Sequence, residues 1–240
     1  MLDEIPVLRA AAERYRDAAI AAGQPWPAPA APDPNPPLDL ARKVFDTDHL
    51  PEQLLWIQNL GWHDRHFVNG CSMEPWPTHD SVRTAFDFLV LAAGVPFNWR
   101  RQIPLFFHDE IVFMFVLDGD RVGEIWRYEI DVDNFGTAIR AATSLATLFD
   151  QWTAGLASGL FSYSPDLGWF STSGNGGTEE FDLYPGLDVL AFPVYIGQEP
   201  WLRERQRACG VDTAAAERDF DEHEQAIDEA EAVYRSLALD

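Results

Sequence analysis

The sequence predicts an α+β fold: a central, largely antiparallel sheet packed by helices, with helical extensions at both ends of the chain. Two β-rich runs, residues 111–117 and 124–131, are joined by an Asp-Gly-Asp turn at 118–120. Glycine tolerates the positive φ that tight hairpin turns require, so this order predicts a β-hairpin. Runs with helical spacing at 81–92 and 137–156 flank the hairpin and complete the α+β pattern.

The two strands of the hairpin differ in their patterning. The run from Ile111 to Leu117 is apolar throughout, which suits a central strand covered on both faces. The next strand alternates, and its apolar face carries Val122, Trp126, Tyr128 and Ile130. Its other face carries Gly123, Arg127, Glu129 and Asp131. We therefore expect the first face of this strand to pack and the second face to meet water.

The helices around the sheet are predicted from apolar spacing and from capping residues. Residues 137–156 follow Asp133 and Asn134, either of which can cap a helix. Residues 81–92 carry apolar side chains at i, i+3, i+4 and i+7, and residues 38–60 contain one or two shorter helical runs. We expect the two longer helices to pack on the sheet.

Composition divides the chain into four segments. They are an N-terminal helix at 1–24, a proline-rich linker at 25–37, the α+β domain at 38–211 and an acidic helix at 212–240. Seven prolines in the linker exclude both a helix and ladder pairing there. The N-terminal helix therefore either docks on the body of the protein or serves as a mobile appendage.

The chain after Gly159 is rich in loops. Short strands are predicted at 160–163 and 187–196, on either side of a glycine run at 173–178. Because this run lacks the Lys of the GxxxxGK[ST] phosphate-binding motif, we interpret it as a surface loop.

The order of elements resembles that of the SUKH superfamily, which includes fungal cell-wall regulators and many bacterial toxin-immunity proteins. The matching pieces are an Ile-Pro strand start at 103–104, a strand exit at 126–131 and a helix of the Ala-x-Ser-Φ-x-x-Φ-Φ type at 142–149, where Φ is apolar. The Leu-Pro helix of the family is echoed at 50–57. The resemblance implies a SUKH-like α+β fold and a non-catalytic immunity protein that neutralises a toxin, without a cofactor.

Net charge narrows the range of partners. The chain has 39 acidic and 17 basic side chains, a formal net charge of −22. Such a surface repels phosphate backbones and anionic membranes, so we expect neither nucleic acid nor a membrane as a partner. A basic protein, such as a cognate nuclease toxin, is favoured instead. A surface kept acidic only for solubility is the alternative.

Cysteine use and the N-terminus indicate the compartment. Cys71 and Cys209 are the only cysteines, and they lie far apart in the sequence. Secreted scaffolds use many more, so we expect a cytoplasmic location. The first residues are acidic where a signal peptide needs positive charge, and no apolar run is long enough to span a membrane.

A histidine cluster supports an alternative function, that of a metal-dependent hydrolase. His63, Asp64 and His66 offer two imidazoles and a carboxylate, and four further residues could join them in space: His79, Asp80, His108 and Asp109. The spacing matches no specific metal motif, and HExxH is absent. We therefore predict no metal site and no catalysis. A scaffold or regulatory module, in which the N-terminal helix tethers another protein, is the other alternative.

We predict that acidic residues near the hairpin exit and the glycine run form the contact face for a basic partner. They are Glu129, Asp131, Asp133, Glu179, Glu180 and Asp182. They follow or flank short elements that are expected to share one edge of the sheet, where loops gather and sites tend to form.

Overall fold

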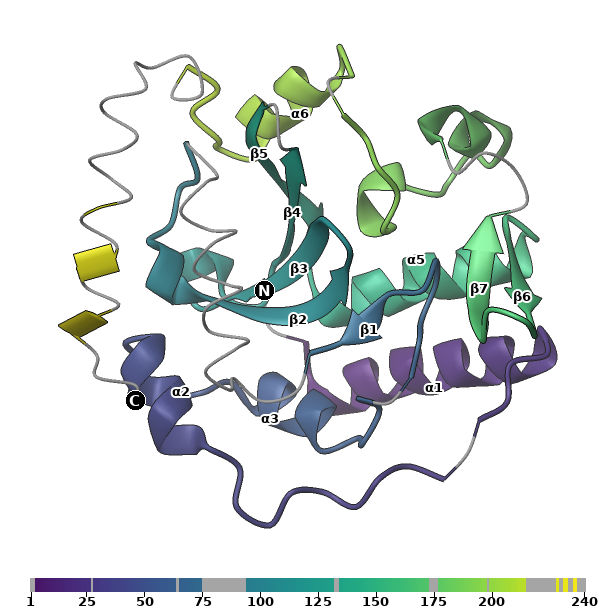
Figure 1. Cartoon of the computed structure of the whole chain (residues 1–240), viewed down its shortest axis with the longest axis horizontal. Helices are drawn as coiled ribbons and strands as arrows, with labels where there is room; N and C mark the ends of the chain where they lie inside the picture. Colours follow the sequence, from purple (N-terminus) through teal and green to yellow (C-terminus); the bar gives the residue numbers. More distant parts are fainter. Residues whose placement is uncertain are drawn as a thin grey trace.

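The protein has an α+β fold, as predicted, with a five-stranded antiparallel sheet, a separate two-stranded sheet and helices around them (Figure 1). The computed structural model describes residues 3–26, 28–63, 65–74, 94–131, 134–172, 177–197, 199–214, 228, 231–232 and 235–236. The strand order of the main sheet is β1-β2-β3-β4-β5, so neighbours in sequence are neighbours in space. Its strands are β1 (Ser72–Met73), β2 (Gln102–His108), β3 (Ile111–Val116), β4 (Ile125–Asp131) and β5 (Asn134–Ala142).

The predicted hairpin is confirmed as β3 and β4. Every residue of β3 is buried, as expected for a central strand with cover on both faces. Its register with β4 places Met114 opposite Trp126 and Phe113 opposite Arg127. A 3-10 turn connects the strands, and Gly119 adopts the positive φ of +48° that the turn requires.

The run predicted as one long helix at 137–156 is instead a strand followed by a helix. Residues Asn134–Ala142 form β5, which pairs with β4, and α5 spans Leu145–Ala157. Ser144 has an extended backbone, and its Oγ accepts a hydrogen bond from Thr147 N over 3.2 Å, so Ser144 is the cap in place of Asp133 or Asn134. The helix thus begins at Leu145, directly after this cap.

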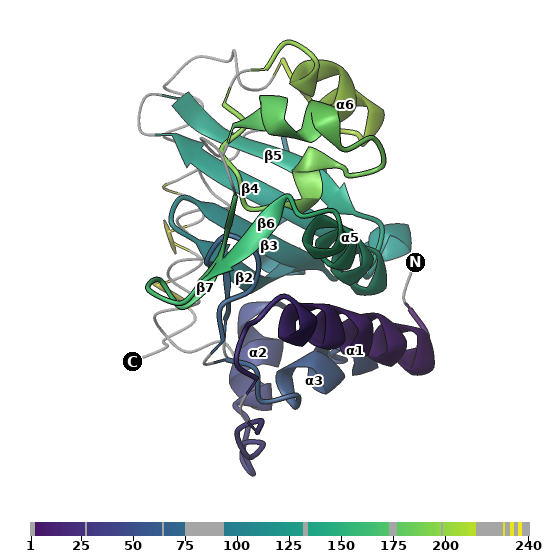
Figure 2. The same cartoon turned by 90° about the vertical axis from the view of Figure 1, so that its right-hand side faces the viewer.

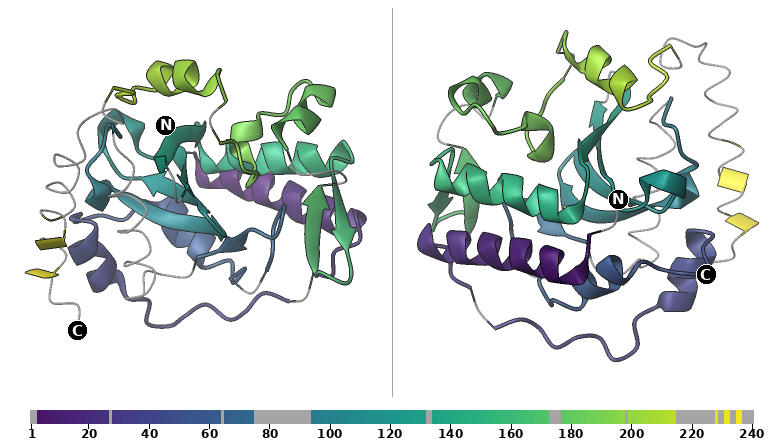
Figure 3. Two further views of the ribbon diagram at one scale, coloured as in Figure 1. Left: turned by 45° about the horizontal axis from the view of Figure 1, so that its top comes forward. Right: turned by 180° about the vertical axis from the view of Figure 1, so that it is seen from behind.

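The N-terminal helix docks on the body of the protein. Helix α1 (Ile5–Ala21) buries Leu8, Tyr15 and Ala19, and it lies alongside α5 (Figures 2 and 3). The ring of Tyr15 stacks on Phe67 at 5.6 Å between centroids. Of the two arrangements that the sequence left open, the structure has the docked one, and α1 shares the main hydrophobic core.

Shorter elements complete the fold. The predicted short helices at 38–60 are α2 (Leu38–Val44) and α3 (Glu52–Gln58), while α6 (Leu202–Ala208) packs near β5. The second sheet consists of β6 (Phe161–Ser164) and β7 (Trp169–Thr172). Residues 187–196, predicted as a strand, instead contain the 3-10 helix η4 (Val189–Ala191) followed by an extended segment that belongs to neither of these two sheets.

Two predicted helices lie wholly or mostly outside the described residues. These are the helix at 81–92 and the acidic helix at 212–238. Of the second, residues 212–214 are described and are not helical, whereas residues 228, 231–232 and 235–236 are described and helical. Within the described part of the chain, no helix combines the length and apolar character needed to cross a bilayer.

Replacement of Trp126 by Ala should reduce the free energy of unfolding by about 3–5 kcal/mol, the range for removing a large buried aromatic side chain. Trp126 has no exposed surface and meets the Phe97 ring at 4.9 Å, and its indole N–H donates to Glu124 over 2.9 Å. Urea unfolding measures the loss, and Leu183→Ala at an exposed position is the control. An unchanged denaturation midpoint for Trp126→Ala would contradict the packing described here.

Candidate functional site

The charged face of β4 is buried, which overturns the prediction that it meets water. Arg127 and Glu129 are 1% and 3% exposed, and they form an ion pair with 2.6 Å between Arg127 Nη2 and Glu129 Oε2. The extended segment at 192–197 covers them. Glu129 is therefore not available at the surface as a contact for a partner. It acts inside the protein instead.

Arg127 fixes the first half of this covering segment. Its Nη1 donates to the carbonyl of Phe192 over 3.0 Å, and its Nη2 donates to the carbonyl of Val194 over 2.8 Å. Burial lowers the pKa of Arg127 to about 10, while the charge of Glu129 and its hydrogen bond oppose that shift. The guanidinium therefore remains protonated at neutral pH and satisfies two carbonyls that have no strand partner.

Glu129 fixes the second half of the covering segment. Its Oε2 accepts a hydrogen bond from Ile196 N over 3.0 Å, and its Oε1 accepts one from Gly197 N over 2.8 Å. Together the two side chains bind four backbone groups of one segment, so they replace the ladder that a neighbouring strand would supply.

Other side chains hold the same segment. The indole N–H of Trp152 in α5 donates to the carbonyl of Ala191 over 2.7 Å. Asn69 donates from Nδ2 to the carbonyl of Pro193, also over 2.7 Å. Residues 191–197 are thus tied to the sheet, to α5 and to a loop that precedes β1, and we call them the clamped segment.

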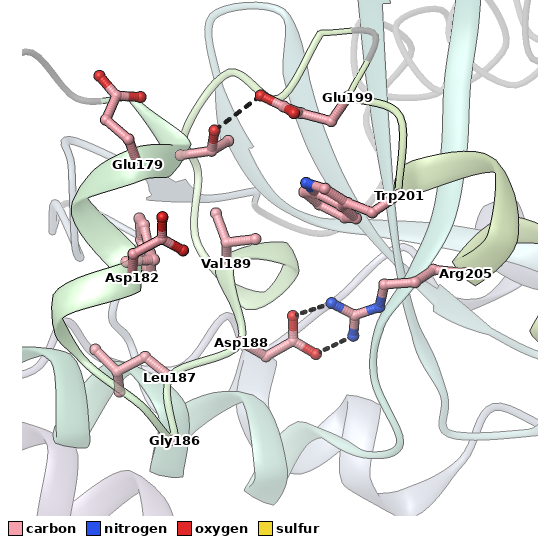
Figure 4. A pocket seen from close by; sticks show the side chains of 11 residues that line it. Glu179, Asp182, Gly186, Leu187, Asp188, Val189, Glu199, Trp201 and Arg205 are labelled. Atoms are coloured by element: carbon pink, nitrogen blue, oxygen red, sulfur yellow. Dashed lines mark hydrogen bonds and ion pairs between the residues drawn. The ribbon is translucent and has the colours of Figure 1, made fainter.

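A groove of about 820 Å³ is lined by residues that come before and after the clamped segment in sequence (Figure 4). Its walls are the 3-10 helix η3 (Thr178–Leu183), residues 186–189 and residues 199–205. The second and third walls lie at the two ends of the clamped segment, so the clamp sets the distance between them. A volume of this size falls within the range of about 300–1,000 Å³ that is typical of ligand pockets.

The charge of the groove is predominantly negative. Four carboxylates line it, those of Glu179, Asp182, Asp188 and Glu199, against the single cation Arg205. Arg205 makes a two-pronged ion pair with Asp188, at 2.8 and 2.5 Å. In the described part of the chain, the other three carboxylates have no Arg, Lys or His within ion-pairing distance. The groove therefore presents uncompensated negative charge.

Aromatic and apolar side chains share the groove with these acids. Trp201 projects into it between Glu199 and Arg205, and the Arg205 guanidinium carbon lies 5.8 Å from the centre of the indole ring (Figure 4). Phe181, Leu187 and Val189 provide apolar lining. Thr178 donates from its hydroxyl to Glu199 over 3.1 Å and fixes that carboxylate.

The structure brings together only part of the predicted contact face. Glu179 and Asp182 line the groove, and Glu180 lies between them on η3. The side chain of Asp131 and the whole of Asp133 lie outside the described residues. Sequence reasoning missed the opposite wall, formed by Glu199, Trp201 and Arg205, which is about twenty residues from η3 and shares no periodicity with it.

The predicted alternative metal site does not assemble within the described residues. His63 donates a hydrogen bond to the carbonyl of Gln58 over 3.2 Å, and His66 donates one to Gly70 over 3.1 Å. No group of three His, Cys, Asp or Glu suited to a metal occurs in the described part of the chain. Three members of the predicted cluster lie outside that part: Asp64, His79 and Asp80.

A second pocket, of about 850 Å³, is lined in part by residues 193–195 of the clamped segment. It includes His108 and Asp109 at the β2–β3 turn, together with Tyr195 of the clamped segment. Burial lowers the pKa of His108, and Asp109, 3.7 Å away, opposes that shift. With a neutral imidazole, this pocket has two carboxylates, those of Asp109 and Glu110, whereas the groove has four.

No protein-family model matches the chain, and comparisons with curated proteins and with solved structures found no significant match. The fold and the groove are therefore interpreted from this structure and from the sequence motifs alone.

Replacement of Glu129 by Gln should lower the free energy of unfolding by about 3–5 kcal/mol, because it leaves the buried Arg127 charge without its counter-ion. Amide hydrogen exchange at Ile196 and Gly197 should accelerate as their acceptor weakens. Urea unfolding and exchange measured by NMR test both effects, with Glu110→Gln at an exposed position as the matched control.

A double variant separates the ion pair from its backbone contacts. Replacing a buried pair by apolar residues is often neutral, but Arg127→Met with Glu129→Leu leaves the Val194 carbonyl and the N–H groups of Ile196 and Gly197 without partners, each at a cost of about 1–3 kcal/mol. The carbonyl of Phe192 keeps its hydrogen bond from Val194 N. We therefore expect the double variant to remain destabilised. Stability equal to that of the wild type would show that the clamped segment does not depend on the pair.

Proposed function

We propose that this chain is a non-catalytic, cytoplasmic binding protein that neutralises a basic partner, most simply an immunity protein for a nuclease toxin. The observation that carries the proposal is the groove. Glu179, Asp182 and Glu199 present carboxylates there that no cation of the described residues neutralises. A partner with positive charge at this surface makes favourable electrostatic contacts with all three carboxylates.

The charge of the whole chain supports the same proposal. A net charge of −22 accelerates encounter with a basic protein and disfavours encounter with nucleic acid. A nuclease must carry basic surface in order to hold phosphates, so an acidic inhibitor can use the surface on which the toxin itself depends. Inhibition of this kind needs no catalytic group.

The SUKH-like motifs also support the proposal. The Ile-Pro pair at 103–104 lies within β2, the residues at 126–131 form most of β4, and Ser144 of the Ala-x-Ser motif caps α5. Most residues of each quoted motif lie on an element of the type that the resemblance implies, although Ala142 of the helix motif is the last residue of β5. We propose on these grounds that the chain is a SUKH-like protein.

The hydrolase alternative lacks a specific observation in its favour, because His63 and His66 each bind a backbone carbonyl and the described residues contain no three-ligand set. The scaffold alternative required a free N-terminal helix, whereas α1 buries its apolar face against α5.

The gene beside this one identifies the partner to test. If it encodes a large secreted protein with a basic C-terminal domain, that domain should arrest growth when expressed alone, and co-expression of this chain should restore growth. A toxin domain that forms no complex with this chain and is not neutralised by it would overturn the proposal.

Charge reversal tests whether the groove is the contact surface. Changing Glu179, Asp182 and Glu199 together to Lys should slow association with the toxin domain by at least about tenfold, because charges near an interface act mainly on the on-rate. Stopped-flow or surface-plasmon measurements report this rate. Added salt should weaken the wild type through screening over about 10 Å at 0.1 M.

A matched triple variant controls for total charge. Glu13, Asp120 and Asp166 are exposed and lie on α1, the β3–β4 turn and the β6–β7 turn, and none of them lines the groove. Changing these three to Lys alters the net charge equally. An equal slowing by both triple variants would show that net charge, and not the groove, governs association.

A further inference from the structure

We propose that the groove is a docking site for one arginine side chain of the partner protein, with an apolar residue beside it that packs on Leu183. This inference rests on the proposed function and names the chemistry that the groove selects. The occupant is a segment of a basic protein, because the uncompensated charge of the groove is negative.

The groove already holds one guanidinium, that of its own Arg205. That group lies over the Trp201 ring at 5.8 Å and makes two hydrogen bonds to the Asp188 carboxylate, at 2.8 and 2.5 Å. Stacking on an indole together with forked bonding to a carboxylate is the arrangement that favours Arg over Lys. A second guanidinium finds the same two kinds of group, an indole face and a carboxylate, because Trp201 also has Glu199 on its other side (Figure 4).

The remaining carboxylates come from two walls of the groove. Asp182 belongs to η3, whereas Glu199 belongs to the segment that leads into α6, and both line the same space. A planar guanidinium has five N–H donors and can address acceptors on two sides at once, while an ammonium acts as a point charge. Trp201 supplies a flat surface next to Glu199 (Figure 4).

An exposed apolar side chain stands next in sequence to a residue that lines the groove. Leu183, at the end of η3, is 77% exposed, more than any other large apolar side chain among the described residues. A single exposed leucine is ordinary, but this one directly follows Asp182, which lines the groove. A partner segment with an arginine next to an apolar residue would contact both the acidic groove and Leu183.

Blocked amino acids test the groove without knowledge of the partner. N-acetyl-arginine amide, titrated into the ¹⁵N-labelled full chain, should shift the Trp201 indole N–H signal, which is assigned by its loss in Trp201→Phe. We expect saturable, millimolar binding, with the lysine compound at least about threefold weaker and the uncharged citrulline compound giving no shift.

Two variants test whether the arginine compound binds in the groove. Glu199→Gln and Asp182→Asn should each weaken arginine binding by about five- to tenfold, because each removes a charge-assisted acceptor. Glu204→Gln, on the exposed surface of α6 and outside the groove lining, should leave it unchanged. Equal weakening by all three, equal binding of citrulline, or no shift with the arginine compound would overturn the arginine site.

The toxin-domain experiment and the titration with the arginine compound test the two proposals separately. If the chain neutralises a basic toxin while Glu199→Gln and Leu183→Ala leave the affinity for that toxin unchanged, the arginine site is wrong and the proposed function stands. If the arginine compound binds as described but no toxin domain is neutralised, the groove binds guanidinium and the immunity function is wrong.

Discussion

The second half of this chain depends on a buried ion pair between Arg127 and Glu129. Burying two charges is expensive, and their mutual attraction seldom repays the loss of hydration by itself. Here each side chain also binds two backbone groups of the clamped segment, so the pair satisfies six polar groups in one place, counting its own two. The pair thus substitutes for a sixth strand. Residues that cannot join a ladder still find partners for their backbone, and the segment is fixed on the sheet.

The fixed position of the clamped segment determines where two acidic walls of the groove lie. The groove wall at 186–189 leads into the clamped segment and the wall at 199–205 leaves it, so both walls inherit its position. Gln151 of α5 adds to this by accepting a hydrogen bond from Asp188 N over 2.7 Å. The carboxylates of Asp188 and Glu199 are held by Arg205 and Thr178. Carboxylates held in place before a partner arrives lose little conformational freedom on binding, which increases affinity. A surface of mobile acids with the same net charge lacks this advantage.

The sequence predicted the elements that local pattern determines and missed those that tertiary contacts determine. The hairpin, α1 and the short helices follow from turn chemistry and apolar spacing, and the structure has them. Strand β5 was missed because its alanine-rich residues extend the helical spacing of α5 upstream, and only pairing with β4 makes them a strand. Arg127 and Glu129 were placed in water because charged residues are rarely buried, and the clamped segment that buries them is more than sixty residues away in sequence. For the same reason the η3 side of the groove was predictable as an acidic surface, whereas the wall around Glu199 and Trp201 was not.

The difference between surface acidity and a fixed acidic groove bears on how an inhibitor can be specific. A net charge of −22 speeds encounter with any basic protein, so net charge alone cannot distinguish one basic partner from another. Discrimination requires contacts that only the correct partner completes, and these act mainly on dissociation. In the proposed arginine site, Trp201 and the carboxylates around it supply such contacts to one planar cation in one orientation. Acidity spread over the surface then sets how fast partners meet, and the groove beside the clamped segment sets which of them stay.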